Sequence, residues 1–438
     1  MQTISGFSKL NKTEKIKWLS SQVAKNIQDE FISIDRFWHQ NQKEQKVFDD
    51  FSENTISNYY FPYGVAPNFR INNEIYTVPM VIEESSVVAA ASKSAKYWLS
   101  RGGFKTKVIS TTKSGQVHFI FKGDKEKLKN FFTVNKVKLI SATKEITKNM
   151  ESRGGGIKEL TLVDKTSSLE NYFQLDAKFE TCDAMGANFI NSVLECFAEN
   201  LKYLASCYSS FSDSEKNIDI IMSILSNYTP ECLVQAYVEC PVEELGNFGK
   251  LAPNEFAYKF ERAVQIAKVD VNRAVTHNKG IFNGIDSVVV ATGNDFRAIE
   301  ACGHAYAAKD GQYRGLSSCT IDNGIFRFEL TIPMAMGTVG GLTSLHPMSK
   351  MSLALLNNPS AERLMEITAV VGLAQNFGAL RSLVTTGIQK GHMKMHLLNI
   401  LNQLGANKEQ IESAKKYFND KTVSFSAVRE FLQVGPLQ

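Results

Sequence analysis

Two adjacent acids, Glu83 and Glu84, interrupt an apolar stretch in the segment VPMVIEESSVV. The residues before them favour a β-strand, and those after them favour a helix that begins at Ser85 or Ser86. A carboxyl group at such a turn is partly removed from water, which raises its pKa and keeps a proton available for donation. The alternative is a pair of exposed acids that the helix dipole favours at the first turn. This segment alone leaves both interpretations open.

Short polar side chains are also crowded into residues 273–298, around the apolar run IDSVVV. Polar groups at this density must be satisfied by one another or by a ligand. A partly buried lysine beside an aspartate can polarise a carbonyl group and stabilise an oxyanion. A turn with surface polar groups is the alternative. The polar residues are Arg273, Thr276, His277, Asn278, Lys279, Asn283, Asn294 and Asp295.

Two glycine-containing loops could accept phosphate, although neither is a GxGxxG motif after a strand. In DAMGAN (183–188), Asp183 can cap a helix and Gly186 lets a phosphate approach the first-turn amides. GTVGG (337–341) is the second loop. An ordinary helix cap and turn explain either loop equally well. In GHMKMH, His392 and His396 lie four residues apart, which suits an acid–base histidine better than a metal site, since HExxH is absent.

Composition limits the classes of protein that these residues can serve. The 438 residues suggest about three domains. The charge of +4, from 49 Lys+Arg against 45 Asp+Glu, is too balanced for a nucleic-acid-binding protein. No apolar run reaches the ~18 residues of a membrane helix, and no secretory signal is visible. Seven scattered cysteines without a CxxC pair favour reduced thiols in the cytoplasm.

Several elements are expected to position the candidate residues. A strand is predicted at 74–80, a helix follows from Ser85 or Ser86, and IDSVVVATGND is expected to be a strand that opens into a helix. TKVISTT and QVHFIF are expected to form a hairpin through KSG, and GIFRFELTIPMAM to form a strand pair. NYYFPYGVAPNF is expected to be a packed loop. Mixed strands and helices after residue 104 predict a compact α+β insert of about 110 residues.

Taken together, these segments resemble the class II, bacterial-type 3-hydroxy-3-methylglutaryl-CoA reductases. The matching segments occur in the order of that family and span about residues 52–395. No single segment is decisive, but the ordered set is specific. The segments are ENTISNYYFPYGVAPNFRIN, VPMVIEESSVVAAAS, DAMGAN, RAVTHNKGIFNGIDSVVVATGNDFRA, GTVGG and GLAQNFGALRSLVTTGIQKGHM.

The resemblance implies a role for each matching residue. The catalytic positions of the family fall on Glu84 (rather than Glu83), Lys279, Asp295 and His392. Substrate-binding positions fall on Ser86, Arg273, Asn283 and Gln375, and Lys9 stands where an arginine for the CoA phosphate is usual. The DAMGAN match implies cofactor contacts from Asp183, Met185, Gly186 and Asn188. The family pattern is broken at Ser85, where proline is usual, and in ENTISNYYFPYG, where ENVIG is common.

The resemblance also implies a multidomain α+β and α/β fold. A large mixed α/β substrate domain (1–109 and 221–375) is expected to carry an inserted ferredoxin-like nicotinamide-binding domain (110–220) and a mobile helical C-terminal flap (376–438). The active site of the family forms at a dimer interface, so a homodimer or a higher oligomer of dimers is expected. Neither nucleic acid nor a membrane is an expected partner.

The implied reaction is the four-electron reduction of 3-hydroxy-3-methylglutaryl-CoA to mevalonate and CoA, or its reverse, in isoprenoid metabolism. NADPH or NADH would supply the electrons, and no metal is required. Lys279 would stabilise the oxyanion, His392 would protonate the CoA thiolate, and Glu84 would supply the proton for mevaldehyde, with Asp295 tuning the Lys–Glu pair. Two alternatives remain: a lyase with Lys279 as Schiff-base nucleophile, and an acyl-CoA binding protein without turnover.

Overall fold

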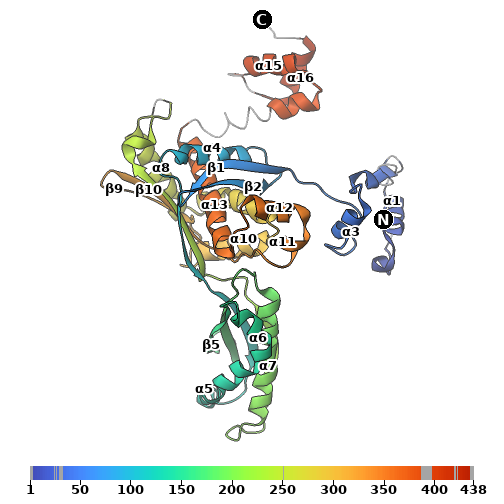
Figure 1. The fold of residues 1–438 in the computed structure, drawn as a ribbon, viewed down its shortest axis with the longest axis vertical. Coiled ribbons are helices and arrows are strands. Elements are labelled where there is room, and N and C mark those ends of the chain that lie inside the picture. Colours follow the sequence, from blue (N-terminus) through green and yellow to red (C-terminus); the bar gives the residue numbers. More distant parts are fainter. Residues whose placement is uncertain are drawn as a thin grey trace.

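The computed structural model describes residues 3–23, 25, 27–28, 33–249, 251–385, 397–418, 421 and 423–434. A large domain lies at the centre of the molecule, and a small domain extends from one end of it (Figure 1). The N-terminal segment contains η1 (Phe7–Lys9), α1 (Lys12–Ser21), η2 (Ser33–Phe37) and α3 (Gln42–Asp49). The C-terminal helices α15 (Lys408–Tyr417) and α16 (Phe425–Val434) have a small apolar core of their own.

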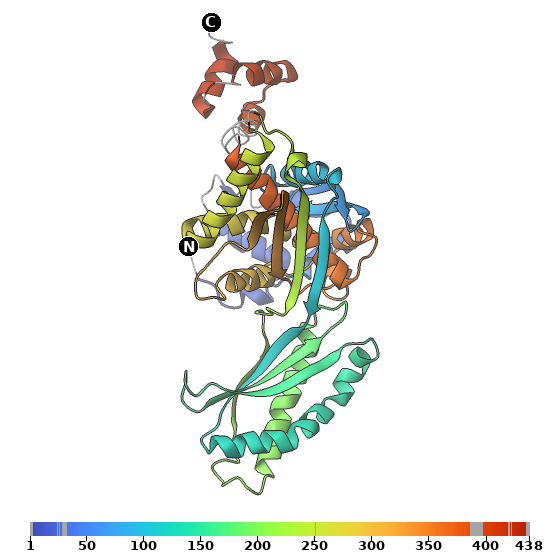
Figure 2. The same ribbon diagram turned by 90° about the vertical axis from the view of Figure 1, so that its left-hand side faces the viewer.

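The large domain is built on an antiparallel sheet and a hairpin. The sheet has the order β3-β8-β10-β9, and β1 pairs with β2 alone. Figure 2 shows the sheet beside the helices that cover it. The strands are β1 (Tyr63–Ile71), β2 (Glu74–Val81), β3 (Lys105–Thr111), β8 (Cys232–Pro241), β9 (Ser317–Asp322) and β10 (Ile325–Pro333). The helical elements are α4 (Val87–Leu99), η3 (Val242–Leu245), α8 (Pro253–Val269), α9 (Val271–Ala291), α10 (Phe296–Ala307), α11 (Leu342–Leu345), α12 (Pro347–Leu355) and α13 (Ala361–Val384).

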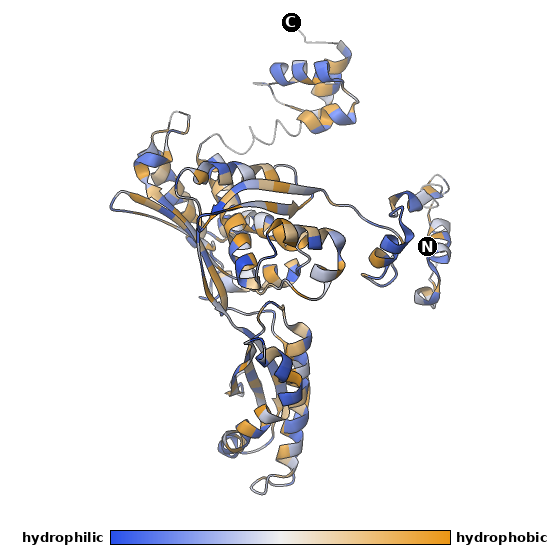
Figure 3. Ribbon diagram, in the orientation of Figure 1, coloured by the Kyte–Doolittle hydropathy of each residue, from blue (hydrophilic) through white to orange (hydrophobic). Residues whose placement is uncertain are grey.

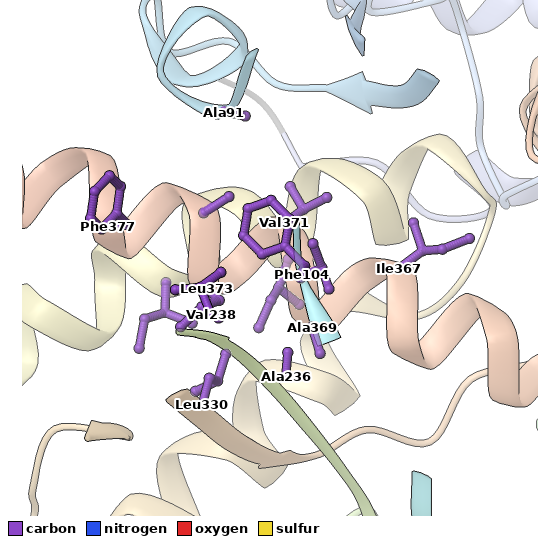
Figure 4. Packing of buried hydrophobic residues seen from close by; sticks show 14 of the residues in the cluster. Ala91, Phe104, Ala236, Val238, Leu330, Ile367, Ala369, Val371, Leu373 and Phe377 are labelled. Carbon is purple, nitrogen blue, oxygen red and sulfur yellow. The ribbon is translucent and has the colours of Figure 1, made fainter. Parts of the chain in front are cut away.

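The helix α13 is the centre of the large domain. It packs against α4, α8, α9 and the sheet, and its side chains are buried on nearly every face. Figure 4 shows Val371, Leu373 and Phe377 of this helix among side chains of the sheet, including Val238 and Leu330. Among the described residues α13 is also the one helix long and apolar enough to cross a membrane, but 72% of its apolar window is buried, as in a core helix.

The small domain has the β-α-β-β-α-β order of a ferredoxin-like fold. Its antiparallel sheet has the order β5-β6-β4-β7, and a separate apolar core lies between the sheet and its helices. Buried and partly buried residues alternate along the strand at Tyr172–Glu180, as expected of a sheet with one covered face. Figure 3 shows hydrophobic and hydrophilic residues mixed along the ribbons of this domain. The elements are β4 (Lys113–Ile120), α5 (Lys125–Ala142), α6 (Lys144–Glu151), β5 (Gly156–Asp164), β6 (Tyr172–Glu180), α7 (Ala187–Ser206) and β7 (Asp219–Leu225).

Two of the expected domain boundaries differ from those in the structure. The strand β7 pairs with β4, so the small domain extends through Leu225 rather than ending at 220. The helix α13 continues without a break to Val384, and Phe377 and Leu380 are fully buried in the large domain. A flap that begins at 376 is therefore wrong at its start, because that position lies inside the core helix.

Three of the expected elements are wrong in kind. TKVISTT and QVHFIF do not form a hairpin, because β3 pairs with β8 in the large domain while β4 pairs with β6 and β7 in the small one. The run IDSVVV is not a strand but the end of the helix α9, whose apolar side chains are buried against α13. GIFRFELTIPMAM is not a strand pair either: it contains the single strand β10, which forms a hairpin with β9.

Candidate active site

An ion pair between Glu84 and Lys279 forms the centre of the candidate site. Glu84 lies in the turn between β2 and α4, and Lys279 lies in the middle of α9. The Nζ atom of Lys279 is 2.6 Å from Oε2 of Glu84. Asn283 lies one turn further along α9, and its Nδ2 atom is 3.4 Å from the same oxygen. The side chains of Lys279 and Glu84 are 61% and 35% exposed, so the pair is open to a ligand.

The sequence of α9 turns this polar face outward. Its other faces carry buried residues, among them Ala274, Ile281 and Ile285. At Gly284 a Cβ atom would lie only 2.6 Å from the carbonyl oxygen of Val371, so glycine is required for the close approach of α9 to α13. Residues four apart on a helix share a face, which places Lys279 and Asn283 together. The amphipathic pattern thus holds the lysine and the amide over the acidic turn.

Ser86 stands beside this pair in a strained backbone conformation. It precedes α4 with a φ of 83°, in the left-handed region that few residues other than glycine adopt. Its side chain makes no capping hydrogen bond to the helix, unlike most serines at this position. Such strain is concentrated at functional sites, where surrounding structure imposes it. The hydroxyl group is therefore free of the structural role that a capping serine would have.

A cavity of about 900 Å³ lies between the N-terminal segment and α9, α10 and α12. Glu83, Lys279 and Asn283 contribute to its wall, and the volume suits a large organic ligand. The segment 58–69 was expected to be a packed loop, but Tyr59 is 87% exposed and lines this cavity. Tyr60 and Phe61 are exposed in the same way. The second half of the segment is not a loop, because it forms β1.

Arg273 and Gln375 have polar groups without partners. Arg273 is half-buried, has no ion pair or hydrogen bond to any described residue, and its pKa is lowered by burial. Gln375 of α13 is 6% exposed, and among the described residues nothing bonds to its Oε1 atom. Buried polar atoms normally have a partner, so both side chains suit contact with a polar ligand. Arg273 is separated from Lys279 by about 9 Å of helix rise.

A buried hydrogen-bond network that starts from His277 of α9 was not predicted from the sequence. His277 has its Nε2 atom 2.6 Å from Oγ of Ser317, whose hydroxyl donates to Oδ1 of Asn376 at 2.8 Å. Burial lowers the pKa of His277 to about 3, so the ring stays neutral. Asn278 is also used internally, because it bonds the backbone of Arg314 and Leu316. Part of the crowded polar segment is therefore satisfied internally, and the alternative of a turn with surface polar groups is wrong for His277 and Asn278, which are buried in a helix.

Asp295 is not brought to Lys279 or Glu84 within this chain. It caps α10 by accepting hydrogen bonds from the backbone of Arg297 and Ala298, and it forms an ion pair with Arg297 at 3.2 Å. The preceding Asn294 bonds the carbonyl of Val289, ten residues beyond Lys279 on α9. Ten residues of helix rise span roughly 15 Å. The end of α9 next to which Asp295 lies is therefore far from Lys279, and no bond joins Asp295 to Lys279 or Glu84 among the described residues.

A second acidic pair in the cavity wall was also not anticipated. Asp286 of α9 lies near Glu300 of α10, and both residues line the cavity. Burial, together with the neighbouring carboxylate of Glu300, raises the pKa of Asp286 to about 8. Spacing does signal this residue in retrospect, because Asp286 lies seven residues after Lys279 and so on the same helix face.

We expect Asp286→Asn to raise the melting temperature by a few degrees at pH 8 and by less at pH 5. The folded pKa of about 8 lies above the ordinary value of 3.8, so the unfolded chain ionises first as pH rises. Stability is therefore full below the ordinary pKa and is lost as pH approaches the folded pKa. Thermal unfolding at both pH values tests this, with the exposed Asp322→Asn as control. An equal change at both pH values would contradict it.

The DAMGAN residues lie where the small domain meets the large one. Gly186 precedes α7 with a φ of 94°, and a Cβ atom there would lie 2.5 Å from Cγ2 of Thr181, so glycine is required. No side chain caps α7, so its first-turn amides suit a phosphate group. Asn188 is exposed in that first turn, whereas Met185 faces a small internal cavity of about 20 Å³.

The two glycine-containing loops contact each other. The backbone of Thr338 donates to the carbonyl of Asp183 at 2.8 Å, and Ala184 pairs with Val339 as an isolated bridge. The carboxylate of Asp183 accepts from the first residue of α13, Ala361, at 2.8 Å. Asp183 therefore ties the DAMGAN loop to the large domain instead of capping α7.

Two candidate residues lie outside this arrangement. Lys9 is exposed at the end of η1 and is not part of the cavity wall. His392 lies outside the described residues. No group of three His, Cys, Asp or Glu side chains within the described ranges could hold a metal ion.

The fold and the site define a class of protein: a large mixed α/β domain with an exposed lysine–glutamate ion pair beside a cavity, and an inserted ferredoxin-like domain whose helix α7 begins at Gly186. The model of the hydroxymethylglutaryl-coenzyme A reductase family matches residues 13–397, and the chain belongs to this family. The fold and the family that the sequence predicted are thereby confirmed.

Relatives and solved structures that are similar to this chain are reductases of the same family. A 3-hydroxy-3-methylglutaryl-coenzyme A reductase of Archaeoglobus fulgidus is 33% identical and covers 93% of this chain and 89% of its own. A probable reductase of Borreliella burgdorferi is 35% identical, with 92% and 89% covered. The class II reductase of Streptococcus pneumoniae bound to NADPH in open conformations is 35% identical, with a TM-score of 0.72 over 88% of this chain and all of that one.

Proposed function

We propose that this chain is an NAD(P)H-dependent oxidoreductase that reduces 3-hydroxy-3-methylglutaryl-CoA to mevalonate and CoA, or catalyses the reverse oxidation. Membership of the reductase family supports the activity, and the NADPH-bound Streptococcus pneumoniae structure supports the cofactor. The observation that carries the proposal is the Lys279–Glu84 pair at 2.6 Å, with Asn283 beside it. Lys279 and Asn283 also line a cavity large enough for the thioester.

Each side chain has a distinct task in this proposal. The ammonium group of Lys279 stabilises the negative charge that develops on the thioester oxygen. His392 protonates the departing thiolate of CoA. Glu84 then supplies the proton that mevaldehyde requires on its carbonyl oxygen when it is reduced. The reduced nicotinamide supplies the hydride for both reductions when it is bound.

The remaining candidates bind the reactants. The guanidinium group of Arg273 suits the free carboxylate of the substrate, because it can form two parallel charge-assisted hydrogen bonds. Ser86, Asn283 and Gln375 offer neutral hydrogen-bonding groups, and Lys9 offers a cation for the phosphate groups of CoA. The turn at Gly186 and the open amides of α7 suit the pyrophosphate of NADPH or NADH. We place the enzyme in the cytoplasm.

We further propose that two copies of the chain complete each site. Asp295 lies far from Lys279 within one chain, so the aspartate that tunes the pair comes from a second copy. Exposed apolar side chains lie near both positions and suit a contact between subunits: they are Tyr59, Tyr60, Phe61, Val290, Phe296, Leu342 and Leu345. A homodimer with two equivalent sites follows from this exchange.

Complementation tests the shared site. We expect Lys279→Ala and Asp295→Ala each to be nearly inactive alone, whereas dimers formed from an equal mixture recover about a quarter of the wild-type activity. Half of the dimers are then mixed, and one of the two sites in each mixed dimer has both wild-type residues. If Asp295 acted within its own chain, no mixed dimer would have an intact site. Absence of recovery in a mixture shown to exchange subunits would contradict the shared site.

A spectrophotometric assay tests the proposed activity. We expect the absorbance of NADPH or NADH to fall when 3-hydroxy-3-methylglutaryl-CoA is added to the enzyme. The Schiff-base alternative predicts instead that borohydride traps a substrate adduct on Lys279. A binding protein without turnover would give neither result. Parallel measurements with NADPH and NADH also decide the cofactor preference, which the sequence does not reveal.

A further inference from the structure

A buried lysine, Lys113, lies beneath the DAMGAN loop and has no role in the chemistry proposed above. It is the first residue of β4, where the chain passes from the sheet of the large domain into the small one. Its side chain is almost fully enclosed, with 4% of the residue exposed, and it lines the internal cavity of about 20 Å³ with Met185. Lysine is rarely buried to this extent without an ionic partner.

Hydrogen bonds from Lys113 hold the loop in a tight turn. Its Nζ atom donates to Oγ1 of Thr181 at 2.5 Å and to the carbonyl of Ala184 at 2.9 Å. The hydroxyl of Thr181 donates to the same carbonyl at 2.7 Å, and the amide of Ala184 donates to the carbonyl of Thr181 at 3.0 Å. These bonds close the turn just before Gly186, so they determine the position of the first turn of α7.

The charge of Lys113 is unfavourable where it lies. Burial lowers its pKa, and although Glu180 and Asp183 lie near enough to act in the opposite direction, neither forms an ion pair with it. No other described carboxylate does so either. The start of α7 already carries the positive end of a helix dipole, so a buried cation there costs free energy. An anion bound at the same helix start would offset that cost.

We propose that Lys113 is a positioning residue of the dinucleotide site. It holds the turn from Thr181 to Gly186 so that the first-turn amides of α7 face the pyrophosphate of the nicotinamide cofactor. Its charge adds positive potential at that point. Lys113 acts through the loop and not on the reacting atoms. The inference rests on the proposed function, because it takes the occupant of the DAMGAN turn to be NADPH or NADH.

The test compares Lys113→Met with Lys138→Met, an exposed lysine substitution on α5 of the same domain. We expect Lys113→Met to raise the Kd for NADPH at least about tenfold, the range of a lost charged hydrogen bond, while KM for the thioester changes less than about twofold. Lys138→Met should leave both constants unchanged. Wild-type affinity should also fall as pH is raised through the lowered pKa of Lys113, and that decline should be absent in Lys113→Met.

The inference is overturned if Lys113→Met protein shows a cooperative thermal transition and binds NADPH with an unchanged Kd. Should that variant not fold, Thr181→Val decides the matter. It removes one acceptor of the lysine, and an increase of about fivefold in Kd supports the proposal while no change overturns it. If the wild-type protein itself does not bind NADPH or NADH, the proposed function fails instead, so the two failures are distinguishable.

Discussion

Lys279→Ala is expected to lose at least on the order of 10²–10³ in kcat for the CoA thioester, because it removes the charge that stabilises the oxyanion. The fold should survive, since the ammonium group is exposed and its one ionic partner among the described residues is Glu84. Turnover with NADPH and the thermal transition are the two measurements. Lys259→Ala removes another lysine with a single exposed ion pair, to Glu255 on α8, and should retain wild-type activity.

A near wild-type kcat in Lys279→Ala would contradict the assignment of the site. Loss of activity together with loss of the thermal transition would point to a structural role of the lysine. In that case Lys279→Met, which keeps the apolar stem of the side chain, separates the two effects.

The second large effect separates Glu84 from His392. Reduction of free mevaldehyde expels no thiol, so it requires a proton on the new alkoxide but no acid for a thiolate. Glu84→Gln should therefore lose most activity both on the CoA thioester and on mevaldehyde. His392→Gln should lose most of the thioester reaction and keep much of the mevaldehyde reduction. The measurement is kcat on both substrates for each variant.

The pairing of substrates makes the roles of the two residues testable. If His392→Gln destroys mevaldehyde reduction as thoroughly as Glu84→Gln, the role assigned to His392 is wrong. Removal of the chain after Val384 should resemble His392→Gln on the thioester. Truncation is expected to cost more than the point change if the C-terminal segment also excludes water from the site.

The sequence predicted the parts of the site that depend on local pattern. The strand-to-helix turn that carries Glu84 follows from an apolar strand and a helix start only a few residues apart. The density of polar residues at 273–298 indicated a site there, although the helical face that joins Lys279 and Asn283 was not predicted. The order of strands and helices predicted a compact α+β insert, and the resemblance implied that it is ferredoxin-like; the sheet order of the structure has that topology.

The other predictions were wrong because the elements concerned are determined by long-range packing. The run of three valines at 288–290 favours a strand by its β-branched side chains, yet it is helical because α9 is covered by α13 and other elements. The segments flanking KSG have the pattern of a hairpin, but each pairs with strands distant in sequence. No local pattern states which sheet a strand joins.

The same limit applies to residues of the site. The proximity of Asp286 to Glu300 brings together side chains of α9 and α10, and the bonds of Lys113 reach a loop some 70 residues away. Such contacts depend on the fold: residue spacing places Asp286 on the helix face of Lys279, but it does not predict a neighbour on another helix. The separation of Asp295 from Lys279 likewise becomes visible only when α9 is known to be helical to its end at Ala291.

The stoichiometry of the reaction tests the proposed four-electron reduction most directly. Limiting 3-hydroxy-3-methylglutaryl-CoA is added to the enzyme with excess NADPH, and oxidised nicotinamide and free CoA thiol are measured when the reaction ends. We expect the oxidation of two nicotinamides and the release of one thiol for each thioester. Lys279→Ala should give neither signal on the same timescale. Release of thiol without oxidation of the nicotinamide, or no consumption of either reactant by the wild-type protein with NADPH or NADH, would contradict it.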